Sequence, residues 1–164
     1  MKKLDNLQKG IFEIKAMIQS DEDIRKMVYY DSPDALEKTA PSFIQVKDNF
    51  TVSPVYDATK PPFDKNTIIS FSIRRIIEED EATLLRGYLQ ISILTQSNLW
   101  ELNNNKIRPM HISSLIIDKL NNKKISASHK IFFTTAEIAI LNENINGYTL
   151  TFMIEEGAGL EEEF

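Results

Sequence analysis

The sequence contains no cysteine, and this absence excludes disulfide bonds, thiolate catalysis and cysteine-ligated zinc sites. Its two histidines, His111 and His129, lie in no H-x-x-x-H or H-E-x-x-H pattern, and we expect ordinary surface or packing roles for both. The five glycines form no G-x-G-x-x-G or G-x-x-x-x-G-K-S/T phosphate loop and no G-x-S-x-G nucleophile turn. We therefore expect no enzyme, no cofactor and no resident metal.

Long apolar runs and clustered positive charge are also missing. No window approaches the roughly 20 apolar residues that a membrane-spanning helix needs, and the N-terminus does not resemble a signal peptide. The net charge is −5 and no basic patch of the kind used by nucleic-acid binders is evident. We expect a soluble protein, made in a cytoplasm, that binds neither a membrane nor a specific DNA sequence.

The length and the 42% hydrophobic content are enough for one domain with a core of its own. We predict a single α+β domain over residues 1–156 and an acidic C-terminal tail over residues 157–164. The fold class rests on helices packed against a largely antiparallel sheet that includes a long β-hairpin.

Two helices are predicted before residue 31. The first has one apolar face with spacings of 3, 4, 3 and 4, typical of a helix packed on a sheet. Its apolar residues are Leu4, Leu7, Ile11, Ile14 and Ile18. Ser20 as N-cap and Asp23 as the N3 acid predict a short second helix, which Asp31-Ser32-Pro33 would end.

Residues 31–66 form a proline-rich region that we predict to be an extended loop. It holds five of the six prolines, Pro33, Pro41, Pro54, Pro61 and Pro62. A short strand from Phe50 to Tyr56 is compatible with the pattern, and Pro54 would confine it to a sheet edge or a bulge. Long loops are usually functional or disordered, so we favour a segment that orders on assembly over one that wraps its own domain.

Alternating apolar residues predict a long hairpin of two strands, from Thr67 to Ile77 and from Thr83 to Thr95. The connection between them, Glu78 to Ala82, is strongly acidic and would project into solvent. Such solvated carboxylates lack the differing, partly buried environments that acid–base catalysis requires.

The last third of the chain predicts a helix followed by strands. Arg108-Pro109 opens the helix, because proline suits the first helical position, and Asn121-Asn122 closes it. Further strand is expected over residues 131–133 and 137–141, and a final strand over residues 148–154, with Gly147 supplying a positive φ in the turn before it. In that strand Tyr148, Leu150, Phe152 and Ile154 share one face, which marks a half-buried sheet.

The order of these elements resembles that of the small head–tail joining proteins of long-tailed bacteriophages, of the tail-terminator or neck type. The local matches are the segment Tyr30 to Leu36, the helix Ile112 to Leu120 with the Asn-Asn-Lys-Lys-Ile that follows, and the closing strand Asn146 to Phe152. The resemblance spans most of the chain. It implies a virion structural protein without catalytic residues, located at the head–tail interface.

The resemblance also implies the partners. The working unit would be a ring of identical copies, commonly a hexamer, that terminates the tail tube and contacts the tube and neck proteins. DNA would pass through its lumen without specific binding, since six copies carry a formal charge of about 6 × −5 = −30, which repels phosphates. The alternatives are a head-completion or connector protein one layer higher, and a stand-alone α+β module that binds a protein partner.

Candidate assembly contacts follow from exposed or unusual residues in these segments. Trp100 is a candidate because tryptophan is enriched in interface hot spots, although a role in the core or at the hairpin base fits equally well. The full set is Tyr30, Pro33, Pro61, Pro62, Glu78, Glu79, Asp80, Glu81 and Trp100.

Overall fold

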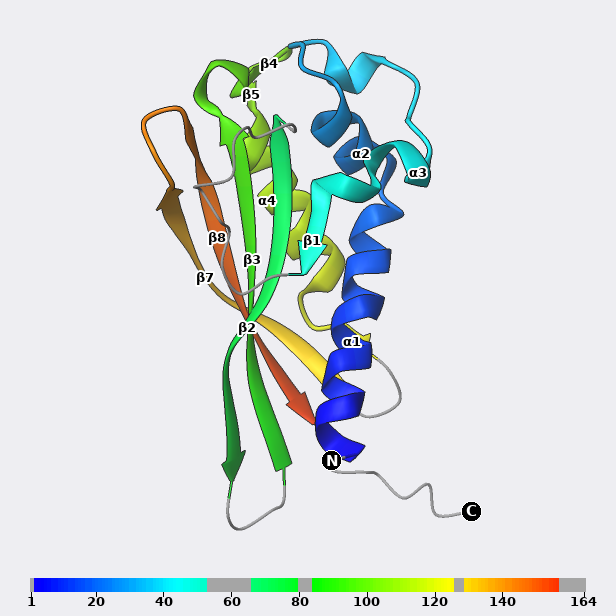
Figure 1. Cartoon of the computed structure of the whole chain (residues 1–164), viewed down its shortest axis with the longest axis vertical. Helices are drawn as coiled ribbons and strands as arrows, with labels where there is room; N and C mark the ends of the chain where they lie inside the picture. Colours follow the sequence, from blue (N-terminus) through cyan, green and yellow to red (C-terminus); the bar gives the residue numbers. More distant parts are fainter. Residues whose placement is uncertain (1, 53–65, 80–83, 126–128, 157–164) are drawn as a thin grey trace.

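A computed structural model describes residues 2–52, 66–79, 84–125 and 129–156. The chain forms an α+β fold in which helices cover one face of a six-stranded, mostly antiparallel sheet (Figure 1). This confirms the fold class predicted from the sequence. The helices are α1 (Lys2–Gln19), α2 (Glu22–Tyr29), the short α3 (Phe43–Val46) and α4 (Arg108–Leu120).

The sheet has the strand order β1-β2-β3-β8-β7-β6. Its long strands are β2 (Thr67–Glu79), β3 (Leu84–Gln96), β7 (His129–Ile140) and β8 (Ile145–Glu156), and its short strands at the edges are β1 (Phe50–Val52) and β6 (Lys124–Ile125). Among the strand pairs of the described sheet, β1–β2 is the only parallel one. A separate two-stranded ribbon, β4 (Glu101–Leu102) with β5 (Lys106–Ile107), lies at the upper end of the molecule in Figure 1.

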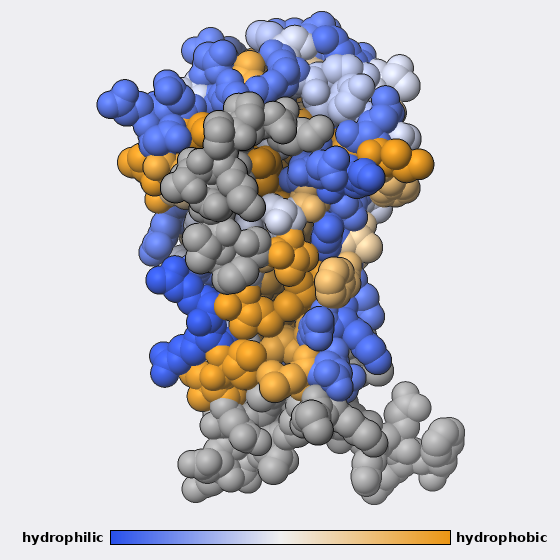
Figure 2. Space-filling model, viewed as in Figure 1, coloured by the Kyte–Doolittle hydropathy of each residue, from blue (hydrophilic) through white to orange (hydrophobic). Residues whose placement is uncertain are grey.

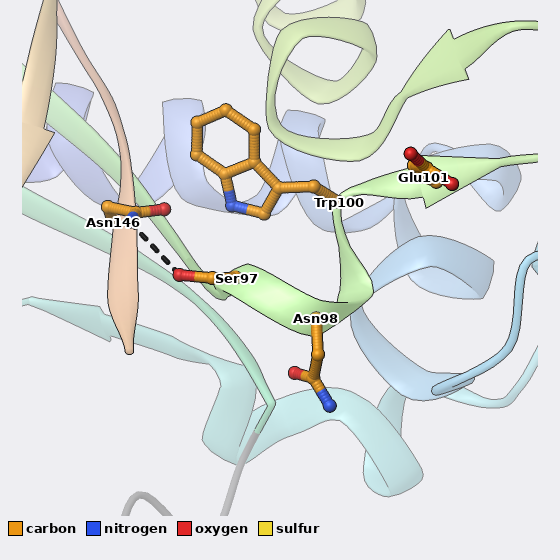
Figure 3. Close-up of a pocket in the computed structure, with 5 residues that line it drawn as sticks. All are labelled: Ser97, Asn98, Trp100, Glu101 and Asn146. Atoms are coloured by element: carbon orange, nitrogen blue, oxygen red, sulfur yellow. Dashed lines mark hydrogen bonds between the residues drawn. The ribbon is translucent and has the colours of Figure 1, made fainter. Parts of the chain in front are cut away.

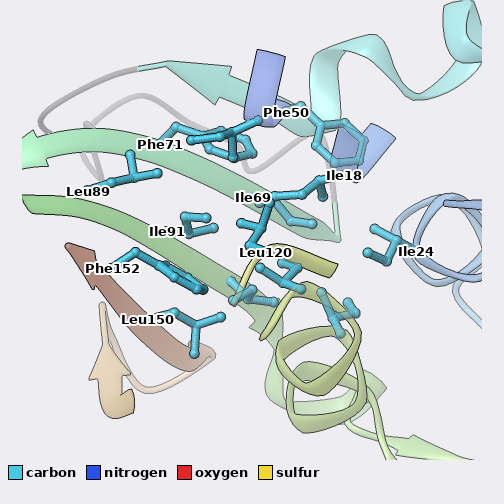
Figure 4. Close-up of a cluster of buried hydrophobic side chains, with 14 of the residues drawn as sticks. Ile18, Ile24, Phe50, Ile69, Phe71, Leu89, Ile91, Leu120, Leu150 and Phe152 are labelled. Atoms are coloured by element: carbon cyan, nitrogen blue, oxygen red, sulfur yellow. The ribbon is translucent and has the colours of Figure 1, made fainter. Parts of the chain in front are cut away.

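The core lies between the helices and the sheet face that they cover (Figure 4). The predicted alternation holds, since Leu150, Phe152 and Ile154 of β8 are buried while Thr149, Thr151 and Met153 on the other face remain partly exposed. The predicted apolar face of the first helix is likewise buried at Leu7, Ile11, Ile14 and Ile18, whereas Leu4 is exposed. Burial of these two patterned faces against each other is what joins helices to sheet.

The N-cap prediction for α2 is wrong by one residue. Asp21, not Ser20, is the N-cap, and its carboxylate accepts hydrogen bonds from the backbone N–H groups of Asp23 and Ile24, each at 3.0 Å. The hydroxyl of Ser20 instead donates to the carbonyl of Met17. An aspartate and a serine are equally good caps by type, so the choice depends on where α1 ends.

The region 31–66 is more structured than an extended loop. It contains the 3-10 turns Ala35–Glu37 and Lys47–Asn49, the helix α3 and the strand β1, which is an edge strand as expected. Buried Asn49 fixes this region, because its amide donates to the carbonyls of Val28 and Thr67, each at 2.9 Å. Residues 53–65, which include Pro54, Pro61 and Pro62, lie outside the described residues.

The two strand pieces predicted between residues 131 and 141 are one strand, β7, with an irregularity in its pairing to β8 between Phe133 and Thr135. The bulge interrupts the alternation of side chains there, which is why the sequence pattern breaks without the strand ending.

The prediction for Gly147 is also wrong. No glycine among the described residues has a positive φ, and Gly147 lies inside β8, not in the turn. A glycine is needed at position 147 because a side chain does not fit there: a Cβ would lie 1.8 Å from the carbonyl oxygen of Ile93 on β3. The backbones of β3 and β8 therefore approach here as closely as only glycine permits.

Replacing Gly147 by alanine should destabilise the fold by about 1–3 kcal/mol or more, because the strand pair must move apart to admit the methyl group. Gly10→Ala in α1 is the matched control. Its new Cβ meets only Ile125 Cγ2 at 3.7 Å, an ordinary contact. In a helix interior that change should stabilise the protein by about 0.5–1 kcal/mol. Urea unfolding midpoints measure both, and equal midpoints for the two variants would contradict this account.

Candidate functional site at the upper end of the sheet

Arg108 organises the upper end of the molecule from a buried position. Its side chain is 1% exposed although it is the first residue of α4. The guanidinium donates to the carbonyls of Leu99 at 2.8 Å, Tyr30 at 2.8 Å and Ser32 at 2.9 Å, and also to that of Met27. These acceptors belong to the C-terminal end of α2, to the segment after it and to the turn before β4.

Burial lowers the pKa of Arg108, and the nearby carboxylate of Asp31 acts in the opposite direction. The guanidinium nevertheless stays charged, because arginine loses its proton only at very high pH. A buried cation of this kind is tolerated where its donors are satisfied and where the carbonyl end of a helix faces it. Arg108 therefore fixes three chain segments relative to one another.

Trp100 lies directly beside Arg108, and its ring packs against the ring of Tyr148 of β8, with the two ring centroids 6.2 Å apart. Its backbone carbonyl accepts a hydrogen bond from the N–H of Arg108 at 2.7 Å. Trp100 also lines an open pocket of about 470 Å³ together with Ser97, Asn98, Glu101 and Asn146 (Figure 3). Trp100 is thus half-buried: one part of its side chain packs against Tyr148 and another part lines the open pocket. Both a packing role and a surface role, the two alternatives from the sequence, are compatible with this position.

Two buried polar atoms in this pocket have no hydrogen-bond partner among the described residues, the indole Nε1–H of Trp100 and the amide Oδ1 of Asn146. They lie on facing sides of the pocket in Figure 3, where the Asn146 amide donates to the hydroxyl of Ser97 at 3.0 Å. One is a donor and the other an acceptor. Leaving such groups unpaired costs free energy, which makes this pocket a candidate contact for a polar group of a partner.

The outer half of β7 continues this surface. Ile138 pairs across the sheet with Tyr148, and Ile140 pairs with Asn146. These isoleucines are 69% and 76% exposed. β6 pairs with β7 only at His129 and Lys130, so within the described part of the chain no strand covers the edge from Thr134 to Ile140.

The structure brings together three of the predicted assembly contacts. Tyr30, Pro33 and Trp100 all lie around Arg108: the carbonyl of Tyr30 accepts from its guanidinium, and the carbonyl of Pro33 accepts from the N–H of Asn103 in the β4–β5 turn at 2.8 Å. The hydroxyl of Tyr30 donates to the carbonyl of Thr39, and the Lys38 ammonium lies 5.0 Å from the Tyr30 ring centre.

The other predicted contacts are not part of this site. Glu78 and Glu79 end β2 at the opposite end of the sheet, while Pro61, Pro62, Asp80 and Glu81 lie outside the described residues. Sequence reasoning missed Arg108, Ile138, Ile140 and Asn146. The isoleucines carried a signal, since apolar residues at positions 138 and 140 share one face of a strand.

The ionisable groups nearby do not form a catalytic arrangement. Burial, with Lys106 next to it, lowers the pKa of His111, while Asp23 and Asp21 oppose this shift. Nζ of Lys106 lies 3.3 Å from Nε2 of His111. Within the ranges that the structure describes, no three His, Asp or Glu side chains are grouped so that they could hold a metal ion. In the same ranges no helix is both long and apolar enough to cross a membrane.

Comparison with known proteins adds one family. A family model with the description YomW matches residues 21–154 of the chain. No curated protein matches the sequence. Among solved structures, the chain is similar to a protein in the virion of a native gene transfer agent particle, with 12% identity and a TM-score of 0.43 over 74% of this chain and 87% of that chain.

Replacing Arg108 by methionine should destabilise the protein by about 3 kcal/mol or more, since buried carbonyls of α2 and of the turn before β4 lose their donor. Arg75→Met is the matched control, because Arg75 is exposed on β2 and its loss should cost less than about 0.5 kcal/mol. Urea unfolding followed by circular dichroism gives both values. A cost for Arg108→Met no larger than that of the control would show that the guanidinium contacts are dispensable.

Proposed function

The chain belongs to the YomW family, a phage-associated family, and from this premise we propose that it is a structural protein of a phage virion. Three features support the proposal: the family, the resemblance of the element order to head–tail joining proteins, and a surface with exposed apolar side chains but without a catalytic arrangement in the described ranges. Its place of action would be the virion.

The observation that carries the proposal is the distribution of exposed large apolar residues. The core is well formed, yet Ile138, Ile140 and Ile44 are 69%, 76% and 79% exposed. Clustered exposure of this kind on a folded domain marks a surface that another protein covers. Two such surfaces, at Ile44 and at Ile138 with Ile140, would suit a subunit that has a neighbour on each side.

In its specific form, the proposal is a ring of identical copies, of the hexameric kind found in the tail-terminator type, that caps the tail tube and joins it to the neck. The acidic composition suits a ring through which DNA passes without binding, because net negative charge repels phosphates. A head-completion or connector ring one layer higher is the alternative within the same virion region.

Deleting the gene from the phage that encodes it should separate these roles. Loss of a tail terminator should leave heads unjoined and tails of irregular length, because nothing stops tube growth. Loss of a connector should leave tails of normal length beside heads that release their DNA. Electron microscopy of lysates measures both, and complementation by the wild-type gene is the control. Normal infectious particles from the deletion would refute a structural role in the virion.

A further inference from the structure

The β7 flank, defined as Thr134 to Ile140, is an apolar sheet edge without a described neighbour. Seven residues of a strand extend over about 23 Å, at roughly 3.3 Å per residue. Within this flank Glu137 is the only charged residue, and Ile138 and Ile140 point to the same face. Proteins usually protect such edges with lysine, proline or a covering element, and the described residues place none of these on this one.

A second apolar surface lies on the opposite edge of the sheet. We call it the α3–β1 flank, defined by Phe43, Ile44, Lys47 and Val52. Phe43, Ile44 and Val52 are 56%, 79% and 44% exposed, and Lys47 is exposed in the turn between α3 and β1. Figure 2 shows apolar surface over the end of β7 on one side of the molecule and over α3 on the other.

The two flanks lie at the same level of the sheet. Reading across the strands, Phe50 of β1 pairs with Ile69, Ile69 with Ile93, Ile93 with Tyr148, and Tyr148 with Ile138 of β7. Two copies placed side by side therefore bring one α3–β1 flank to one β7 flank without any shift along the strands.

Charge favours this pairing over a contact between two β7 flanks. On and directly beside the α3–β1 flank, Lys47, Asp48 and Arg25 carry a net charge of +1 (two cations and one anion), and the Arg25 guanidinium lies 4.7 Å from the Phe43 ring centre. The β7 flank carries −1 from Glu137. Opposite charges attract across such an interface, whereas two β7 flanks would bring like charges together.

We infer that the β7 flank of one copy packs against the α3–β1 flank of the next copy. The contact is heterologous, since different surfaces of the same chain meet, and repeated contacts of this kind close into a ring when the rotation between copies allows it. The inference rests on the proposed function, because it names the surfaces through which that ring would form. Its hydrophobic centre is Ile138 and Ile140 against Phe43, Ile44 and Val52.

The natural absence of cysteine makes a direct test possible. Ile138→Cys and Val52→Cys are prepared as separate full-length variants, mixed, and oxidised with copper phenanthroline. The mixture should give a covalent dimer on a non-reducing gel, while each variant alone should stay monomeric. A third variant, Lys9→Cys on the exposed side of α1, is the matched control and should form no dimer with either. A dimer from Ile138→Cys alone would instead show a symmetric β7 contact and overturn the inference.

Charge exchange gives an independent test. Glu137→Lys should raise the dissociation constant of the assembly, measured by analytical ultracentrifugation, by about tenfold, and adding Lys47→Glu should restore it. Both residues are exposed, so the urea unfolding midpoints of these variants should match that of wild type. An unchanged dissociation constant for Glu137→Lys, or no recovery in the double variant, would count against this interface.

The outcomes separate this inference from the proposed function. Wild-type rings seen by native mass spectrometry, together with no dimer in the mixed cysteine sample, would overturn the pairing of these flanks and leave the ring intact. A normal deletion phenotype, together with a specific mixed dimer, would overturn the virion role and leave the contact between copies intact.

Discussion

The arrangement at the upper end of the molecule depends on one buried guanidinium. Arg108 must give up hydration to occupy its site, and it recovers that cost only if the carbonyls after α2 and before β4 converge on it. The same residue begins α4, whose apolar face completes the core. The hydrogen bonds of the Arg108 guanidinium therefore help to set the positions of three neighbouring parts of the chain. These are Trp100, the β4–β5 ribbon and the segment 30–33. The candidate assembly surface lies directly beside this buried side chain, because Trp100 contacts Arg108 and also lines the pocket.

The regular elements could be predicted because their cause is local and periodic. The apolar face of α1, the β2–β3 hairpin and the alternation of β8 all follow from side-chain spacing. The errors arose where the deciding partner is remote in the sequence. Gly147 looked like a turn residue because its neighbour Ile93 is visible only after β3 and β8 pair. The proline-rich region looked irregular because Asn49 acquires its role only when Val28 and Thr67 lie beside it.

The candidate site was predicted less well than the fold, for a related reason. Whether an isoleucine is exposed depends on which other elements pack over it in the folded protein. Ile138 and Ile140 therefore could not be distinguished from core isoleucines such as Ile131 by residue type or spacing. Trp100 was named as a candidate contact because of its residue type, and Tyr30 and Pro33 because of their unusual local sequence. Arg108 was read only as the start of a helix, because a sequence does not show that a charged side chain will be enclosed. Arg108 contacts Tyr30 and Trp100 only through the tertiary structure.

The strand order has a consequence for how the protein is made. β8, the last of the described strands in chain order, lies between β3 and β7 in the middle of the sheet. During synthesis, β3 and β7 are therefore both made before the strand that pairs with each of them, and the two halves of the sheet are joined only when β8 has emerged. A prematurely terminated chain lacks the strand that joins the two halves of the sheet, so it cannot present both flanks in the register described above. Only molecules synthesised at least as far as β8 can then present both flanks on one sheet, so the strand order ties these surfaces to synthesis of β8.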